Sequence, residues 1–258
     1  MHFFDSHCHL DDSSYTKDFE KMIDRAKEAG VTGMMTVGVT ERSSEICVHV
    51  AEQYDGVYAS VGIHPHDAKE CSEEVLKHLE KLSKSSKVKA WGETGLDFNR
   101  MHSPKNVQEK WFIRQLEYAY RLDLPLIFHE RDSEGRFLEI LKHHEVKNRR
   151  GVVHCFSGDK KELESYLDLG LYIGITGIIT MNERGETLRD LVRYIPSDRI
   201  LIETDAPYLT PAPHKNKTRR NEPSFVPAVL LKIAEVLEKD SKTIAESIWD
   251  NTCELYGI

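Results

Sequence analysis

The sequence predicts a (β/α)8, or TIM, barrel with extra helices at its C-terminal end. Eight short apolar or β-branched runs alternate with longer amphipathic segments along the whole chain. This alternation predicts right-handed βαβ units and a parallel sheet. A length of 258 residues is ordinary for one such barrel, and no sequence repeat or Pro/Gly-rich linker divides the chain. We therefore expect one domain over residues 1–258, with an open doubly wound sheet as the alternative fold.

The eight expected strands are short, as buried parallel strands are. In chain order they are Phe3–Asp5, Gly33–Val37, Tyr58–Val61, Ala90–Gly92, Leu126–Phe128, Val152–Val153, Tyr172–Ile175 and Ile200–Ile202.

Apolar residues recur at helical spacing between these strands, which predicts helices with one buried face. The four clearest patterns are Phe19-Met22-Ile23-Ala26, Trp111-Phe112-Gln115-Leu116-Ala119, Leu163-Tyr166-Leu167 and Leu188-Leu191-Val192-Ile195. Gly30 and Gly170 stand where helices should end. The tail from Ser224 to Ile258 predicts two more helices that cover the barrel.

Composition restricts the classes of function. The net charge of −8 counts against a nucleic-acid partner, because phosphates favour a basic protein surface. Bound metal would neutralise some of those carboxylates, so the objection is weak. The five cysteines are odd in number and lack CxxC spacing, which indicates reduced thiols in the cytoplasm, or the nucleus of a eukaryote. We expect neither a signal peptide nor a membrane span.

Metal-binding side chains gather at the carboxyl ends of the expected strands, which meet on one face of a barrel. These candidates are His7, His9, Glu93, His129, His154 and Asp205. His7 and His9 are two residues apart, so in an extended strand both rings point the same way. A closed tetrahedral site needs four ligands. Six candidates are better explained by two ions that share a carboxylate, an arrangement suited to phosphoryl displacement.

Seven motifs follow one another along the chain: FDSHCHLD, VGIHPH, GETGLDF, FHERD, HCFSG, YIGITG and ETDAPYL. In this order they resemble the TatD family of metal-dependent DNases, within the amidohydrolase-type barrel superfamily. The similarity covers nearly the whole chain. It implies a divalent-metal-dependent deoxyribonuclease. We expect a 3′–5′ exonuclease that prefers single-stranded DNA, with an endonuclease as the alternative, because loop geometry decides between the two modes. The implied cofactors are two divalent ions, magnesium in most relatives and manganese or zinc in others.

The resemblance also assigns the ligands. His7 and His9 would hold the first ion with Asp205, and Glu93 would bridge both ions. The ligands of the second ion would be His129 and His154. Many members of the superfamily carry a modified lysine on the fourth strand, whereas this sequence has a glutamate there, as TatD proteins do.

The expected reaction is hydrolysis of a phosphodiester by a metal-activated water. Asp205 is the candidate general base, and Glu93 and His64 complete the catalytic set. His64 would contact the phosphate or protonate the leaving oxygen. Candidate substrate contacts are His66, although a turn-stabilising role is equally consistent, and Arg131, which could instead pair with Asp132 or Glu134.

A basic run, HKNKTRR, follows the last strand. Charge runs are usually solvated loops, but this one should lie beside the metals, so Arg220 is a further candidate DNA contact. DNA is the expected partner, and we expect a monomer. Two other functions remain open: a metal-dependent amidohydrolase or esterase of a small molecule, and a partner-binding protein that retains a metal site.

Overall fold

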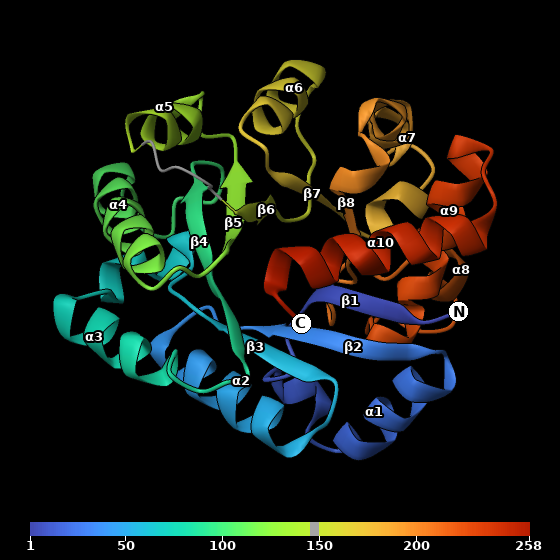
Figure 1. The fold of residues 1–258 in the computed structure, drawn as a ribbon, viewed down its shortest axis with the longest axis horizontal. Coiled ribbons are helices and arrows are strands. Elements are labelled where there is room, and N and C mark those ends of the chain that lie inside the picture. Colours follow the sequence, from blue (N-terminus) through green and yellow to red (C-terminus); the bar gives the residue numbers. More distant parts are fainter. Residues whose placement is uncertain (145–149) are drawn as a thin grey trace.

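The computed structural model describes residues 1–144 and 150–258, and eight parallel strands form its single sheet (Figure 1). Each strand pairs with the next strand in the sequence, in the order β1 to β8. The strands are β1 Phe3–Cys8, β2 Val31–Val37, β3 Val57–Val61, β4 Val88–Asp97, β5 Leu126–Arg131, β6 Gly151–Val153, β7 Tyr172–Ile175 and β8 Ile200–Ile202. All eight expected strands are thus present.

The first and last strands meet just beyond the end of β8, where the chain continues alongside β1. The N–H of Asp205 donates to the carbonyl of His7 at 2.9 Å, and the N–H of His9 donates to the carbonyl of Ala206 at 2.8 Å. The hydroxyl of Ser6 also donates to the carbonyl of Ile202. These bonds close the sheet into a (β/α)8 barrel, as the sequence predicts, and the open doubly wound sheet is excluded.

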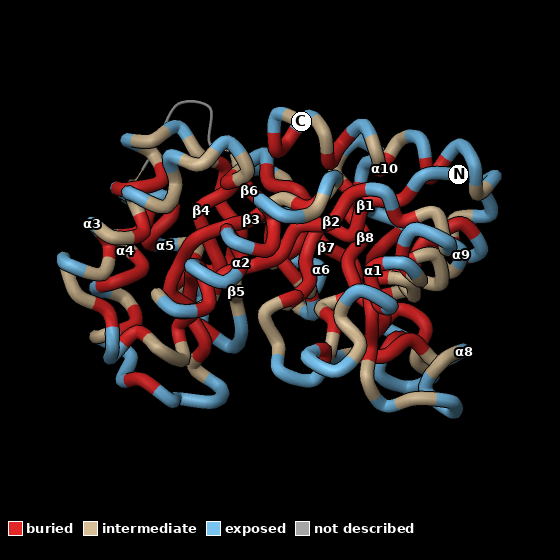
Figure 2. The backbone as a smooth tube through the Cα atoms, turned by 90° about the horizontal axis from the view of Figure 1, so that it is seen from below, coloured by how far each residue is buried: buried red, intermediate tan, exposed pale blue. Residues whose placement is uncertain are grey.

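Helices surround the barrel (Figure 1). They are α1 Phe19–Glu28, α2 Glu41–Gln53, α3 Glu73–Leu82, α4 Lys105–Arg121, α5 Arg136–His143, α6 Lys160–Asp168, α7 Glu186–Leu191, α8 Ala212–Lys215, α9 Val226–Leu237 and α10 Ser241–Tyr256. Figure 2 shows the strands almost wholly buried, with exposed residues on the outer sides of the helices and in the loops. The two helices expected in the tail are α9 and α10.

The amphipathic patterns predict the buried faces well. In α1 the buried residues are Met22, Ile23 and Ala26, and in α4 the expected apolar residues are likewise buried. The pattern that ends at Ile195 is wrong about length, because α7 stops at Leu191 and a 3-10 turn follows. Ile195 precedes a proline, whose ring disfavours helical backbone at the preceding residue.

Apolar side chains fill the barrel interior near the amino ends of its strands. This cluster includes Phe4, Met35, Ala90, Ile127, Val152, Tyr172 and Leu201, and Leu255 and Tyr256 from α10 join it. Helix α10 therefore closes the amino-terminal end of the barrel. Polar side chains occupy the opposite end, where ligands bind in barrels of this kind. Among the described residues, no helix has the length and apolarity needed to cross a bilayer.

Candidate metal centre

Strands β4 and β5 carry two of the six predicted ligands inside the sheet rather than beyond its edge. Glu93 lies within β4 and His129 within β5, while His154 directly follows β6. The two strands approach closely at Gly95, where a Cβ atom would lie 1.8 Å from the carbonyl oxygen of His129. Gly95 also has φ +150°, a conformation that side chains disfavour. A glycine at this position lets Glu93 and His129 lie side by side.

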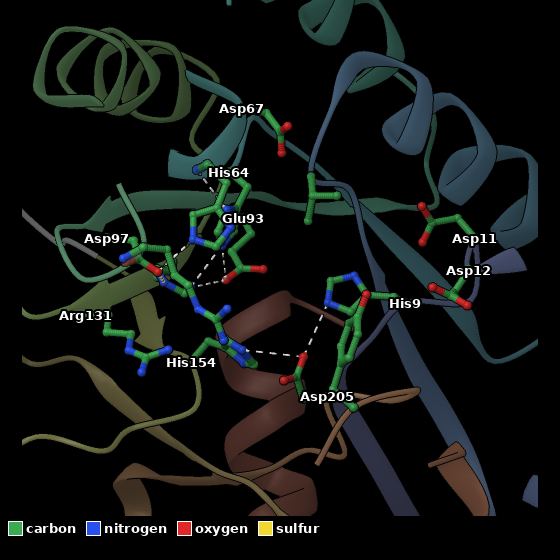
Figure 3. Close-up of a pocket in the computed structure, with 15 residues that line it drawn as sticks. His9, Asp11, Asp12, His64, Asp67, Glu93, Asp97, Arg131, His154 and Asp205 are labelled. Carbon is green, nitrogen blue, oxygen red and sulfur yellow. Dashed lines mark hydrogen bonds and ion pairs between the residues drawn. The ribbon is translucent and has the colours of Figure 1, made fainter. Parts of the chain in front are cut away.

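A cavity of about 460 Å³ opens at the carboxyl ends of the strands (Figure 3). Five of the six predicted ligands line it, together with His64, His66 and Arg131. The sixth ligand, His7, lies beneath it and is fully buried. In Figure 3 the cavity separates Arg131 from Asp11 and Asp12, which lie on the opposite side of the ligands.

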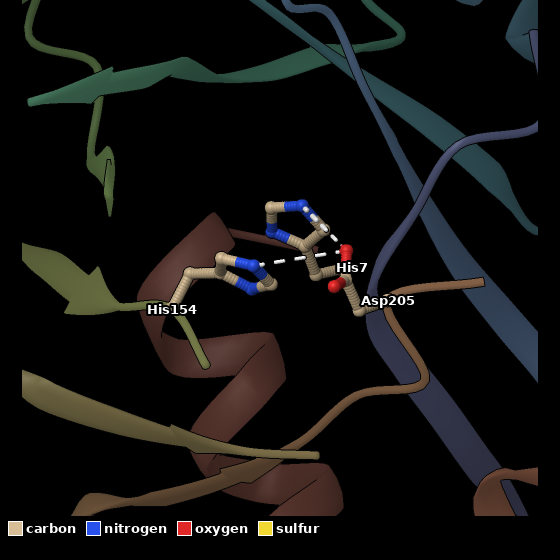
Figure 4. A group of neighbouring side chains, drawn as sticks. All are labelled: His7, His154 and Asp205. Atoms are coloured by element: carbon tan, nitrogen blue, oxygen red, sulfur yellow. Dashed lines mark ion pairs between the residues drawn. The ribbon is translucent and has the colours of Figure 1, made fainter. Parts of the chain in front are cut away.

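One group of ligands surrounds Asp205. Its Oδ1 lies 3.3 Å from Nε2 of His9, 3.9 Å from Nε2 of His7 and 3.7 Å from Nε2 of His154. The rings of His7 and His154 stack with their centroids 3.4 Å apart (Figure 4). Nε2 of His7 also lies 3.4 Å from Oε2 of Glu93. The ligand atoms of His7, His154 and Asp205 are close enough to share one ion, and so are those of His7, His9 and Glu93.

A second group lies on the other side of Glu93. Oε1 of Glu93 is 2.8 Å from Nδ1 of His129 and 3.6 Å from Nε2 of His64, and these two nitrogens are 3.1 Å apart. Glu93 thus contributes one oxygen to each group, as a bridging carboxylate does. His129 is grouped with His64 and His154 with His7, so the expected pairing of His129 and His154 at one ion stays a prediction.

Several buried polar atoms in these groups have no hydrogen-bond partner. They include both ring nitrogens of His7 and Nδ1 of His154. A buried polar atom without a partner costs roughly 1–3 kcal/mol, so such atoms are rare in folded proteins. Ring nitrogens and carboxylate oxygens that converge in this way, some of them without a hydrogen-bond partner, are suited to bind a divalent cation. The residues present therefore fit the metal centre that the sequence predicts.

The carboxylates of the site are held in the ionised form that ligands need. Burial alone would raise the pKa of Glu93, but His64, His154 and His7 outweigh it and hold that pKa well below its usual range. For Asp205, burial is likewise outweighed by the hydrogen bond with His9 and by the nearby histidines, and the pKa is lowered. Both groups are therefore ionised at neutral pH.

The histidines divide into two electrostatic classes. Burial lowers the pKa of His7 and of His64, so these rings are neutral at neutral pH and gain a proton only in acid, where they add to the positive charge beside Glu93. For His9, His129 and His154, burial acts in the same direction, but neighbouring carboxylates prevail and raise each pKa to about 9. In the metal-free protein these three rings carry the positive charge that balances Glu93 and Asp205, a role that a bound cation can take over.

Comparison with known proteins agrees with this geometry. The sequence pattern of TatD-related DNases matches residues 4–257. The chain belongs to the TatD-related DNase family. It is 40% identical, over 99% of its length, to the whole "3′-5′ ssDNA/RNA exonuclease TatD" of Erwinia tasmaniensis. It is 38% identical to the protein of the same name from Klebsiella pneumoniae, with 99% and 98% of the two chains covered.

The solved structure of YjjV, a TatD homologue from Escherichia coli K12, has the same fold. Its TM-score is 0.91 at 31% identity, with 99% of this chain and 98% of that chain covered. Membership of the TatD family makes this protein an enzyme, a hydrolase of the nuclease class.

Two further carboxylates support the TatD-type site, and sequence reasoning gave them no role. Oδ2 of Asp97 accepts hydrogen bonds from Nε2 of His66, at 2.8 Å, and from Nε2 of His129, at 3.2 Å. Oε1 of Glu203 lies 2.9 Å from Nδ1 of His154, although the N–H direction of that ring misses the oxygen. Both residues stand in motifs typical of the TatD family, but sequence alone does not show which ring atoms they face.

The predicted substrate contacts fall in different places. Arg131 lines the cavity, and the alternative partners that the sequence offered are occupied: Asp132 accepts from Asn99, and Glu134 pairs with Lys105. His66 also lines the cavity and is bound to Asp97.

Arg220, by contrast, lies outside the lining of the cavity. Its guanidinium donates twice to the carboxylate of Asp18, at 2.7 and 2.8 Å, and once to the carbonyl of Ser14. The guanidinium of Arg220 also lies over the aromatic ring of Tyr15. These bonds give Arg220 a role in holding the loop after β8 to the start of α1, and its contact with DNA stays a prediction.

Proposed function

We propose that the protein is a divalent-metal-dependent deoxyribonuclease that removes nucleotides from the 3′ end of single-stranded DNA. The observation that carries the proposal is Glu93, a buried carboxylate with one oxygen toward each of two ligand groups. Two cations held a few ångströms apart suit the in-line displacement of a phosphodiester. The relatives named as 3′–5′ exonucleases of single-stranded DNA and RNA support the substrate and the direction.

The proposed cofactors are two ions per chain, with Mg²⁺ as the physiological metal. As the family resemblance implies, His7, His9 and Asp205 would hold one ion, His129 and His154 the other, and Glu93 both. When bound, the ions would supply charge to the phosphoryl oxygens and acidify a water molecule. Since all six ligands come from one chain, we propose that a monomer is active.

Asp205 is the proposed general base. Its carboxylate is ionised and lies at the centre of the group formed by His7, His9 and His154. Asp205 follows the end of β8 by three residues and lines the cavity, with φ +55°, a left-handed conformation that aspartate adopts more readily than most residues other than glycine. From there Asp205 accepts the proton of the attacking water.

His64 is the proposed partner of the leaving oxygen. Its ring lines the cavity, and its Nδ1 accepts the N–H of His66, which fixes the ring at the start of the turn after β3. Nε2 is thereby directed to the cavity, where it contacts the phosphate or donates a proton. Arg131 and His66 extend the phosphate-binding surface along the same side.

Digestion of end-labelled oligonucleotides tests the proposal. With Mg²⁺, a 5′-labelled single strand should shorten one nucleotide at a time, while a circular single strand of the same sequence should persist. EDTA should stop the reaction, and added Mg²⁺ or Mn²⁺ should restore it. Cleavage of the circle would contradict the exonuclease mode. Degradation that survives exhaustive chelation would contradict the metal-dependent mechanism.

A further inference from the structure

Glu203 is a fully buried carboxylate at the end of β8 that the proposed reaction does not use. Its exposed fraction is 0%, and one of its oxygens, Oε2, has no hydrogen-bond partner. Within residues 1–144 and 150–258, its ion-pair partner is His154 alone. Burying a carboxylate without a lysine or arginine beside it is costly. A positive charge close to Glu203 would offset this cost.

The ring of His154 lies between two carboxylates. Nδ1 is 2.9 Å from Oε1 of Glu203, and Nε2 is 3.7 Å from Oδ1 of Asp205. With its Nδ1 side against Glu203, the ring presents Nε2 to the group that would bind the ion. The N–H of Cys155, the next residue along, donates to the same Oε1 and so fixes the position of that oxygen.

The barrel leaves a space for this carboxylate at Gly174, on the neighbouring strand β7. A Cβ atom on Gly174 would lie 2.6 Å from Oε2 and 2.8 Å from Oε1 of Glu203. Any larger residue would therefore displace the carboxylate from His154.

We propose that Glu203 is a positioning residue for the metal centre: its carboxylate, 2.9 Å from Nδ1, holds the His154 ring with Nε2 toward the ion. The inference rests on the proposed function, because it requires a metal centre. A carboxylate behind a metal-bound imidazole fixes the tautomer and strengthens the ligand. Asp97 stands behind His129 in a similar way, but it has other donors in His66 and the N–H of Arg100. Glu203 has the backbone N–H of Cys155 as a further donor, but its charged partner is the imidazole of His154.

The Glu203→Gln variant tests the proposal by comparing metal affinity with metal-free stability. Glu203→Gln takes away the anionic partner of the buried His154 ring, so the EDTA-treated variant should be less stable than wild type in thermal unfolding. Mn²⁺ affinity, measured by calorimetric titration, should fall by roughly 10- to 100-fold. A purely structural role would also lower the melting temperature but would leave the Mn²⁺ affinity unchanged, and that result would overturn the proposal.

Glu222→Gln is the matched control, since Glu222 is a buried carboxylate that pairs with Arg25 away from the cavity. It should lower the melting temperature and leave Mn²⁺ affinity unchanged. Gly174→Ala displaces the carboxylate of Glu203 without removing it, and should also weaken Mn²⁺ binding. Added to Glu203→Gln, it should cost little further affinity, because both changes act on one contact. Fully additive losses would contradict the proposal.

The wild-type titration separates this inference from the proposed function. If wild type does not bind Mn²⁺, the metal centre itself is refuted. If wild type and Glu203→Gln bind Mn²⁺ equally well, the metal centre stands and only the role of Glu203 is refuted.

Discussion

The ring of His129 donates from Nε2 to Oδ2 of Asp97, 3.2 Å away, which leaves its Nδ1 facing Oε1 of Glu93 at 2.8 Å. The other oxygen of Asp97 accepts the N–H groups of Asn99 and Arg100, at 3.0 and 2.7 Å. One carboxylate thus joins a candidate ligand to the loop that forms the rim of the cavity. A displaced rim would therefore disturb the orientation of His129 as well.

Asp205→Asn should abolish turnover while the fold persists. The amide keeps the size of the side chain but cannot accept the proton of the attacking water, so kcat on single-stranded DNA should fall by about 10²- to 10⁴-fold. Circular dichroism should show an unchanged folded spectrum. Wild-type turnover in this variant would refute the role of Asp205 as the general base.

Metal binding should raise the melting temperature of the EDTA-treated protein. A ligand at 100 times its Kd stabilises the folded state by about 2.7 kcal/mol, which corresponds to roughly 5–10 °C in a chain of this size. Thermal unfolding with increasing Mn²⁺ measures the rise. His7→Asn, which removes a fully buried candidate ligand, should show a much smaller rise. An equal rise in both proteins would place the bound ions elsewhere.

Arg131→Ala should weaken the binding of single-stranded DNA most strongly at low salt. For single strands, the logarithm of affinity falls with the logarithm of salt concentration with a slope of about −0.7 per phosphate contact. Loss of one contact should flatten the slope by about 0.7, as fluorescence anisotropy at several salt concentrations can measure. Arg121→Ala is the control, because Arg121 at the end of α4 pairs with Glu80 in α3, and neither residue lines the cavity. The same flattening in both variants would exclude a specific role for Arg131.

Asp18→Asn should lower stability at neutral pH through Arg220 and Arg25. Hydrogen bonds from Arg220 lower the pKa of Asp18 below its usual range, and Arg25 adds to the effect. A lowered folded-state pKa gives stability above the ordinary pKa of about 3.9 and loses it as the pH falls further. The variant should be less stable by about 1 kcal/mol at pH 7 and approach wild type only as the pH falls from about 4 toward about 2, as urea unfolding would show. A difference that does not depend on pH would contradict the ion-pair explanation.

The sequence predicted the barrel, and it selected candidate ligands that lie close together, because metal-binding residues stand at the ends of several apolar runs. An apolar run followed by His or an acid at β1, β5 and β6 is a local signal, and the fold then brings the ends together. The motif containing His64 likewise placed that ring on the correct face, 3.1 Å from His129.

Other features depend on contacts between distant parts of the chain and have no local signal. Arg220 looked like a free cation in a basic run, yet its partner Asp18 comes from the other end of the sequence. Glu203 looked like a neighbour of Asp205 without a role of its own. Its position depends on space left by Gly174 on another strand, which no spacing within its motif reveals.

The hydrogen bond from Asp205 to the carbonyl of His7 has a consequence for biosynthesis. The first strand emerges from the ribosome with its histidines, but their acidic counterpart is translated only after seven more strands. A nascent or truncated polypeptide that ends before Asp205 therefore carries an incomplete ligand set. If these residues bind the metal as proposed, the centre would be assembled only when the last strand docks against the first, and unfinished copies would be inactive.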